Sequence, residues 1–148
     1  MNRRLPISLR NAVQLMPLAL TLAQPLSASA ADLSLNIGPV NLAQGSLRVA
    51  VYDSSDSFRK TAVQQLATAA TAGTMTVKFA NLKPGDYAVA AYHDVNGNEK
   101  LDSNLLGLPK EPYGFSVASG TLLGPPGWNE VKFTLPESGA EQSIGLRE

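Results

Sequence analysis

Three stretches of the chain alternate apolar and polar side chains with a period of two residues. GSLRVAVYD (45–53), TMTVKFANL (74–82) and NEVKFTLPE (129–137) each place apolar residues at every second position. Because successive side chains of a strand point to opposite faces, this period indicates half-buried β-strands. Turn residues separate the stretches, so we predict an all-β fold, an antiparallel sandwich of about seven strands.

Other segments complete the predicted sandwich. DYAVAAYHD (86–94) is apolar at both alternating sets of positions, which is typical of a central strand covered on both faces. Residues 32–37 and 142–147 are predicted edge strands. Lys83-Pro84-Gly85-Asp86 has turn chemistry and is predicted to close a hairpin between its two flanking strands.

The segment between the first two alternating stretches favours a short helix near residues 57–70. Phe58, Ala62, Val63 and Leu66 fall close to helical spacing, and Gly73 is a suitable residue for ending a helix. The threonines and the β-rich surroundings support the alternative, a loop followed by a short strand. The sequence leaves both interpretations open.

The first 31 residues have the features of a secretory signal peptide. A basic beginning precedes an apolar centre, and Ala28-Ser29-Ala30 provides small residues suited to cleavage. Polar residues and prolines dilute the apolar stretch below what a membrane span requires, so we expect no integral membrane segment after cleavage. We predict a signal peptide over residues 1–31, one β-sandwich domain over 32–148, and an exported protein, periplasmic or secreted.

Charge and cysteine content limit the partners and the means of stabilisation. Three of the 12 basic residues lie before Asp32 and none of the 12 acidic residues does, so the remaining chain is net acidic. This argues against nucleic acid, which needs a clustered basic surface. The chain has no cysteine, so an exported domain of this sequence is held together without disulfides.

The stretch HDVNGNEKLDSN (93–104) carries oxygen-bearing side chains at metal-ligand spacing. Asp94, Asn96 and Asn98 stand at alternate positions, the carbonyl of Lys100 would follow, and Asp102 comes next. Calcium takes six to eight oxygens, and alternating positions of a tight loop supply them. The match to an EF-hand loop ends there, so we expect at most a weak calcium site. The alternative is a turn whose Asp and Asn side chains bond their own backbone.

The residues around this loop identify a family resemblance. FANLKPGDYAVAAYHDVNGNEKLDSNLLGLPKEPYGFS (79–116), followed by GPPGW (124–128), resembles the bacterial domain of unknown function family number 2141. The similarity covers roughly residues 45–133. It implies an exported, uncharacterised β-sandwich, immunoglobulin-like or prealbumin-like and akin to B-type repeat domains. The family loop usually has a second glycine where this chain has Glu99, so Glu99 is expected to adopt a positive φ or the turn to differ.

His93 is the only histidine and stands beside Asp94. Adjacent strand residues point to opposite faces, so Asp94 cannot orient the imidazole as a triad acid would. We found no convincing catalytic constellation and predict a protein that is not an enzyme. The segment LLGLPKEPYGFS (105–116) is predicted to lie over the sandwich with its apolar residues closing one end of the core. The residues that could instead form a ligand surface are His93, Lys110, Glu111, Tyr113 and Trp128.

Three function hypotheses follow from these observations. The first is an exported binding or scaffold module, stabilised by a weak calcium site over residues 94–104, with an unknown protein or carbohydrate partner. The second is a small periplasmic hydrolase that uses His93 on a prealbumin-like scaffold. The third is a structural accessory that pairs with a partner through a sheet edge.

Overall fold

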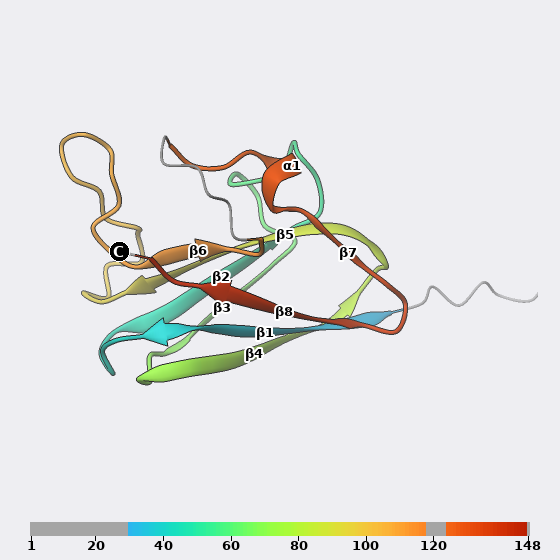
Figure 1. The fold of residues 1–148 in the computed structure, drawn as a ribbon, viewed down its shortest axis with the longest axis horizontal. Coiled ribbons are helices and arrows are strands. Elements are labelled where there is room, and N and C mark those ends of the chain that lie inside the picture. Colours follow the sequence, from blue (N-terminus) through green and yellow to red (C-terminus); the bar gives the residue numbers. More distant parts are fainter. Residues whose placement is uncertain (1–29, 118–123, 148) are drawn as a thin grey trace, which may run out of the picture.

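The computed structural model describes residues 30–117 and 124–147, and they form two β-sheets packed face to face (Figure 1). The predicted signal peptide lies outside the described residues, except for its last two positions. Ala31, the first residue of the first strand, is buried. The elements are β1 (Ala31–Val40), β2 (Ser46–Tyr52), β3 (Gln64–Ala69), β4 (Gly73–Leu82), β5 (Gly85–Asp94), β6 (Tyr113–Phe115), α1 (Trp128–Val131), β7 (Phe133–Leu135) and β8 (Ala140–Gly145).

The smaller sheet has the order β4-β1-β8, and the larger has the order β3-β2-β5-β6 with β7 also pairing with β5. The all-β sandwich predicted from the sequence is therefore confirmed, with eight strands among the described residues. The prediction of purely antiparallel pairing was wrong for one pair, because β1 and β8 run parallel. β8 reaches β1 from β7 of the other sheet, so no tight turn forces these two neighbours into opposite directions.

The main hydrophobic core lies between the two sheets. Alternate residues of β1, β2, β4 and β5 meet there, as the period of two predicted, and residues 33, 35, 37, 47, 51 and 89 are fully buried. Among the residues that the structure describes, the buried members of this core run from Ala31 to Ile144, within the predicted β-sandwich domain and the residue before it.

A second, smaller cluster lies on the outer face of the larger sheet. Phe58, Ala88 and Val131 are buried there, and Tyr52, Phe115 and Trp128 pack around them. The rings of Tyr52 and Phe58 meet edge to face, with centroids 5.4 Å apart. This cluster covers one end of the outer face, where α1 and the β2–β3 connection cross the sheet (Figure 1).

The helix predicted near residues 57–70 does not form. Residues 64–69 form β3, which pairs with β2 from Gln64 opposite Val51 to Ala69 opposite Ser46. The preceding residues form a turn in which the amides of Phe58 and Thr61 bond to carbonyls of Ser54 and Ser57. The exposed edge of β2 offers a ladder of backbone partners, and this tertiary pairing outweighs the weak helical spacing.

The predicted hairpin at Lys83–Asp86 is also a different structure. β4 pairs with β1 and β5 pairs with β2, so the turn carries the chain from one sheet to the other. The hydroxyl of Tyr87 donates to the carbonyl of Lys83 at 2.8 Å and supports this corner. Leu82 and Tyr87 are both buried, and packing each against the core sends the two strands to opposite layers. The central position predicted for β5 is confirmed.

Candidate functional site

Asp94 is the last residue of β5 and the first predicted ligand of the metal loop. Its side chain is fully buried, and both carboxylate oxygens accept hydrogen bonds from the protein. Oδ1 accepts the amide of Asn98 at 3.1 Å, and Oδ2 accepts the amide of Glu99 at 2.9 Å. The Nε of Arg48, on β2, donates to the same Oδ2 at 2.9 Å. Asp94 thus joins the loop to the neighbouring strand.

The pKa of Asp94 reflects these contacts. Burial by itself raises this pKa, because it disfavours the charged form. The amide of Glu99 and the guanidinium of Arg48 stabilise the carboxylate, and the pKa is held below its usual value. Asp94 is therefore a charged acceptor at neutral pH and serves as the anchor of the turn.

The other predicted side-chain ligands, Asn96 and Asn98, are brought together around Asp102. Its two oxygens accept the side-chain amides of Asn96 at 2.7 Å and Asn98 at 3.0 Å. The carbonyl oxygens of the same two side chains accept backbone amides, of Asn98 and of Lys100 respectively. These are the Asx-type bonds of a polar turn, which the sequence left open as the alternative to a metal loop.

Glu99 has a φ of 66°, which is one of the two outcomes expected from its place at a usual glycine position. Its side chain is largely exposed, and its carboxylate lies 2.9 Å from a terminal nitrogen of Arg48. Arg48 therefore contacts both Asp94 and Glu99, and these carboxylates raise the pKa of its guanidinium, with Glu99 contributing most. Arg48 was missed by the sequence prediction, which indicated only that it points away from the core.

Glu111 is buried and braces the base of the loop. One of its oxygens accepts the amide of Val95 at 3.0 Å and the other the amide of Asp102 at 3.1 Å. Its predicted role in a ligand surface does not fit this position, because a buried carboxylate bonded to two amides has no free face. Lys110, next to it, is exposed.

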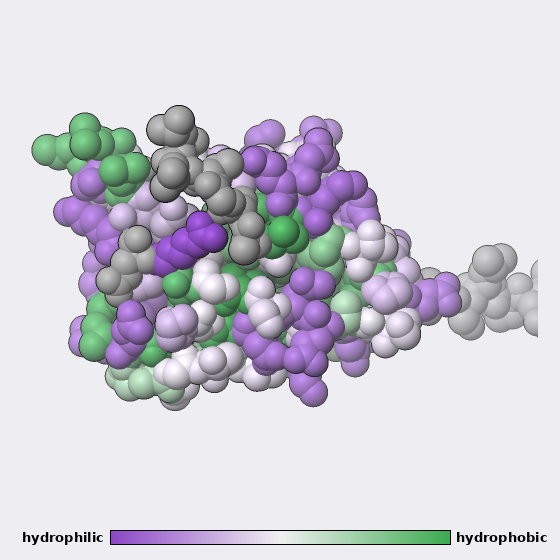
Figure 2. Space-filling model, viewed as in Figure 1, coloured by the Kyte–Doolittle hydropathy of each residue, from purple (hydrophilic) through white to green (hydrophobic). Residues whose placement is uncertain are grey.

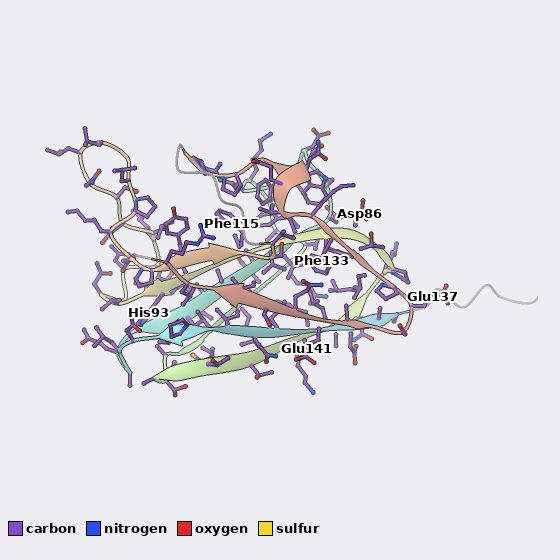
Figure 3. The ribbon with its side chains drawn as sticks, viewed as in Figure 1. Asp86, His93, Phe115, Phe133, Glu137 and Glu141 are labelled. Carbon is purple, nitrogen blue, oxygen red and sulfur yellow. The ribbon has the colours of Figure 1, made fainter. Side chains whose placement is uncertain are left out.

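The other residues of the predicted ligand surface are dispersed. His93 is buried between the sheets, and its Nε2 lies 2.7 Å from the carbonyl oxygen of Gln44 (Figure 3). Asp94 contacts Arg48 on the opposite face of β5, so the predicted separation of His93 from Asp94 is confirmed. Trp128 packs against Phe58 in the second cluster, and Tyr113 stacks edge to face with Phe115. His93, Tyr113 and Trp128 therefore do not converge on one surface with Lys110 and Glu111.

The residues present fit a turn without requiring an ion. Arg48 already supplies the positive charge opposite Asp94, and the donors to Asp102 are side-chain amides. Within residues 30–117 and 124–147, no three His, Cys, Asp or Glu side chains gather as a metal-binding group. Calcium would draw on amide and carbonyl oxygens as well, so a site here would need Asn96 and Asn98 to present their oxygens to it.

A groove that the sequence did not reveal lies on the open half of the outer face of the larger sheet. The pairing of β3, β2 and β5 places Ala50 between Gln65 and Ala90, and Arg48 between Ala67 and Tyr92. Alanines therefore form the floor. Tyr52 bounds one end of the groove, Arg48 and Tyr92 the other, and the volume is about 370 Å³. Finding it needed the register of three strands.

Burial raises the pKa of both tyrosines of the groove, Tyr52 and Tyr92. Their hydroxyls are therefore neutral donors and acceptors at physiological pH. At the far end, the guanidinium of Arg48 is held in place through two of its nitrogens by Asp94 and Glu99. The groove thus combines aromatic walls, a small-residue floor and a positioned cation.

The apolar residues of the 105–108 segment do not close the core, contrary to the prediction. Leu105, Leu106 and Leu108 are 106%, 84% and 54% exposed and form a green projection in Figure 2. The segment turns back within a few residues, since Ser103 pairs with Pro109. This turn is too tight for the leucines to reach the sheets. Further along the segment, Tyr113 and Phe115 lie in β6, and Phe115 packs onto the second cluster.

No helix among the described residues is long and apolar enough to cross a membrane. Comparison with known proteins found no similar curated protein and no similar solved structure. The family model described as an uncharacterized protein conserved in bacteria (DUF2141) matches residues 35–144, which include most of both sheets, the 94–102 loop and the groove. The chain therefore belongs to this family, as the motifs in its sequence predicted.

Proposed function

We propose that this protein is an exported, non-catalytic binding module whose ligand site is the groove on the larger sheet. The observation that carries the proposal is the combination of Arg48, Tyr52 and Tyr92 around a floor of alanines. Its volume of about 370 Å³ falls within the range of roughly 300 to 1,000 Å³ typical of small-molecule sites. Export is proposed from the signal-like first 31 residues.

The chemistry of the groove suits a saccharide. A sugar ring has an apolar face of C–H groups and a rim of hydroxyls. Tyrosines offer an apolar ring face together with a polar tip. Arg48, Gln65 and Glu99 supply several donors and acceptors along the edge of the groove. Because Asp94 and Glu99 hold Arg48 in position, little side-chain entropy would be lost when a ligand binds.

Backbone amide NMR spectra of residues 31–148, the predicted domain with the buried Ala31 of β1 retained, test this proposal. They are recorded with a panel of neutral and acidic oligosaccharides. A ligand should shift the resonances of β2, β3 and β5 around residues 48–52, 65–67 and 90–92. Ala90→Leu fills the floor of the groove and should abolish the shifts by excluding the ligand. The side chain of Ala90 makes no hydrogen bond, so the substitution removes none. Lys78→Leu, at an exposed position of β4 in the other sheet, is the matched control and should leave them unchanged.

Either of two results would contradict the proposal. One is that no oligosaccharide of the panel shifts these resonances, and the other is that the shifts persist unchanged in Ala90→Leu. Shifts confined to the 94–102 loop would place the ligand elsewhere. Thermal melts of both variants would verify that the fold is retained before binding is compared.

We propose a weak calcium site in the 94–102 loop as a second function. The observation that favours it is the pair of carboxamides, on Asn96 and Asn98, that face Asp102. Rotating either side-chain carboxamide by half a turn would direct its oxygen, in place of its nitrogen, toward an ion beside Asp102. Dissociation constants of such extracellular sites are about 0.1 to 1 mM.

A thermal melt in chelator and then in rising calcium tests this site, with magnesium as the control ion. At calcium about 100 times its dissociation constant, binding to the folded state alone adds about 2.7 kcal/mol, which is several degrees for a domain of this size. Asp102→Asn should remove the rise. A midpoint that does not respond to calcium would leave the loop as an Asx turn.

A further inference from the structure

The strongest unexplained feature of the surface is the loop that projects beyond the sandwich. We define the leucine tip as Leu105, Leu106 and Leu108, the three exposed leucines of this loop (Figure 2). Leu105 and Leu106 are almost completely exposed, whereas most large apolar side chains that the structure describes lie in the two clusters. A contiguous apolar projection of this kind marks an interaction site more often than an isolated exposed leucine does.

The backbone of the tip is closed on itself. The side-chain oxygen of Asn104 accepts the amides of Leu106 and Leu108, at 2.9 and 3.0 Å. The amide of Gly107 bonds to the carbonyl of Asn104, and the amide of Asn104 bonds to the carbonyl of Leu108. These donors do not depend on water, so the apex can enter an apolar medium without leaving them unpaired.

The exposed charged side chains next to the tip are basic, which suits an anionic surface. Residues 103–109 carry no charge, and exposed lysines stand on both sides, at positions 100 and 110. Neither ammonium takes part in an ion pair within the described part of the chain. The neighbouring acids are paired or less exposed than the lysines: Glu99 pairs with Arg48, Asp102 is partly buried, and Glu111 is buried.

We propose that the leucine tip docks this protein onto an anionic lipid bilayer. The leucines would enter the boundary between headgroups and acyl chains, while Lys100 and Lys110 would meet the phosphates. A convex, uncharged apex in which the amides of Leu106, Gly107 and Leu108 are bonded suits a fluid interface, which deforms around it. A protein partner would need a matching pocket. This surface is separate from the saccharide groove, so either proposal can fail without the other.

Sedimentation with lipid vesicles tests the docking. Residues 31–148 are mixed with vesicles of phosphatidylcholine containing about a third phosphatidylglycerol, and with vesicles of phosphatidylcholine alone. The protein should bind the anionic vesicles. Leu105→Asn combined with Leu106→Asn should lower the partition coefficient at least about tenfold, because two leucines lose their burial in the bilayer. Lys100→Gln combined with Lys110→Gln should lower it several-fold and remove most of its salt dependence.

A matched control removes two exposed apolar side chains elsewhere. Leu42→Asn combined with Val63→Asn replaces residues that are 54% and 44% exposed, and it should bind as the parent does. All variants should melt as the parent does, since the replaced side chains lie outside the core. The proposal would be overturned if the parent bound neither kind of vesicle, or if the tip variant bound the anionic vesicles as well as the parent does. A dimer that depends on the tip in sedimentation velocity, without vesicle binding, would also overturn it and would assign the tip to a second copy of the chain.

Discussion

Replacing Asp94 with asparagine should destabilise the domain by about 2 to 4 kcal/mol. The substitution keeps the size of the side chain but removes its charge and turns one oxygen into a donor. Asp94 is fully buried and accepts from Arg48 and from the amides of Asn98 and Glu99. A hydrogen bond to a charged group contributes roughly 1.5 to 3 kcal/mol. At least one of these bonds is lost, because its N–H donor is left facing the NH2 group of the asparagine, which cannot accept.

The assay is urea unfolding of residues 31–148, followed by the fluorescence of Trp128, the only tryptophan. In a thermal melt, a loss of about 2 to 4 kcal/mol corresponds to a fall in the melting temperature of roughly 10 °C for a domain of this size. Asp102→Asn is the matched control, because Asp102 is only partly buried and its oxygens accept from side-chain amides. It should cost less than about 1 kcal/mol.

The pH dependence gives an independent readout with a definite sign. The pKa of Asp94 is lowered in the folded state, so its contribution is present above the unfolded pKa of about 3.9. The contribution is lost as the pH falls through the folded pKa. The stability gap between the parent and Asp94→Asn should therefore be full at neutral pH and should narrow below about pH 4. A gap no larger than that of Asp102→Asn, or one unchanged at acid pH, would refute the role given to Asp94.

Substitutions at three further positions have specific expected effects in the same urea assay. Ser116→Ala should cost about 2 kcal/mol, because the buried hydroxyl accepts the amide of Val89 and donates to the carbonyl of Val131; a loss below about 0.5 kcal/mol would show that water replaces it. The Glu99→Gly variant should be more stable than the Glu99→Ala variant by roughly 1 kcal/mol, because both lack the carboxylate and only alanine is strained at a positive φ. Equal stabilities of the two variants would contradict this. Gly114→Ala should cost at least about 2 kcal/mol, because an added Cβ would meet a backbone oxygen; a neutral effect would show that β6 and β8 can separate.

The candidate site was predictable in part. The spacing of Asp94, Asn96, Asn98 and Asp102 located the loop, and the structure brings all four residues together. Their donors and acceptors were not predictable, because Arg48 comes from a strand 46 residues away. The family motif indicated a glycine position at Glu99, and its positive φ follows from that local turn.

The leucines at 105, 106 and 108 show where hydrophobicity alone misleads. Their apolar character predicted burial, but a side chain can be buried only if its backbone brings it to the core. Asn104 closes the turn before that happens. The segment near residues 57–70 fails for a related reason, since its helical spacing competes with the open edge of β2, which only the folded sheet presents.

The amino-acid sequence by itself determined the class of fold, the faces of the main strands and the polar turn after β5. These depend on alternation and on short-range hydrogen bonds, which act between residues close in the chain. Tertiary structure alone decided the parallel pairing of β1 with β8, the corner at Lys83–Asp86, the groove and the Arg48 contacts. These depend on which strands become neighbours and in what register, and that choice is made by packing the whole core at once.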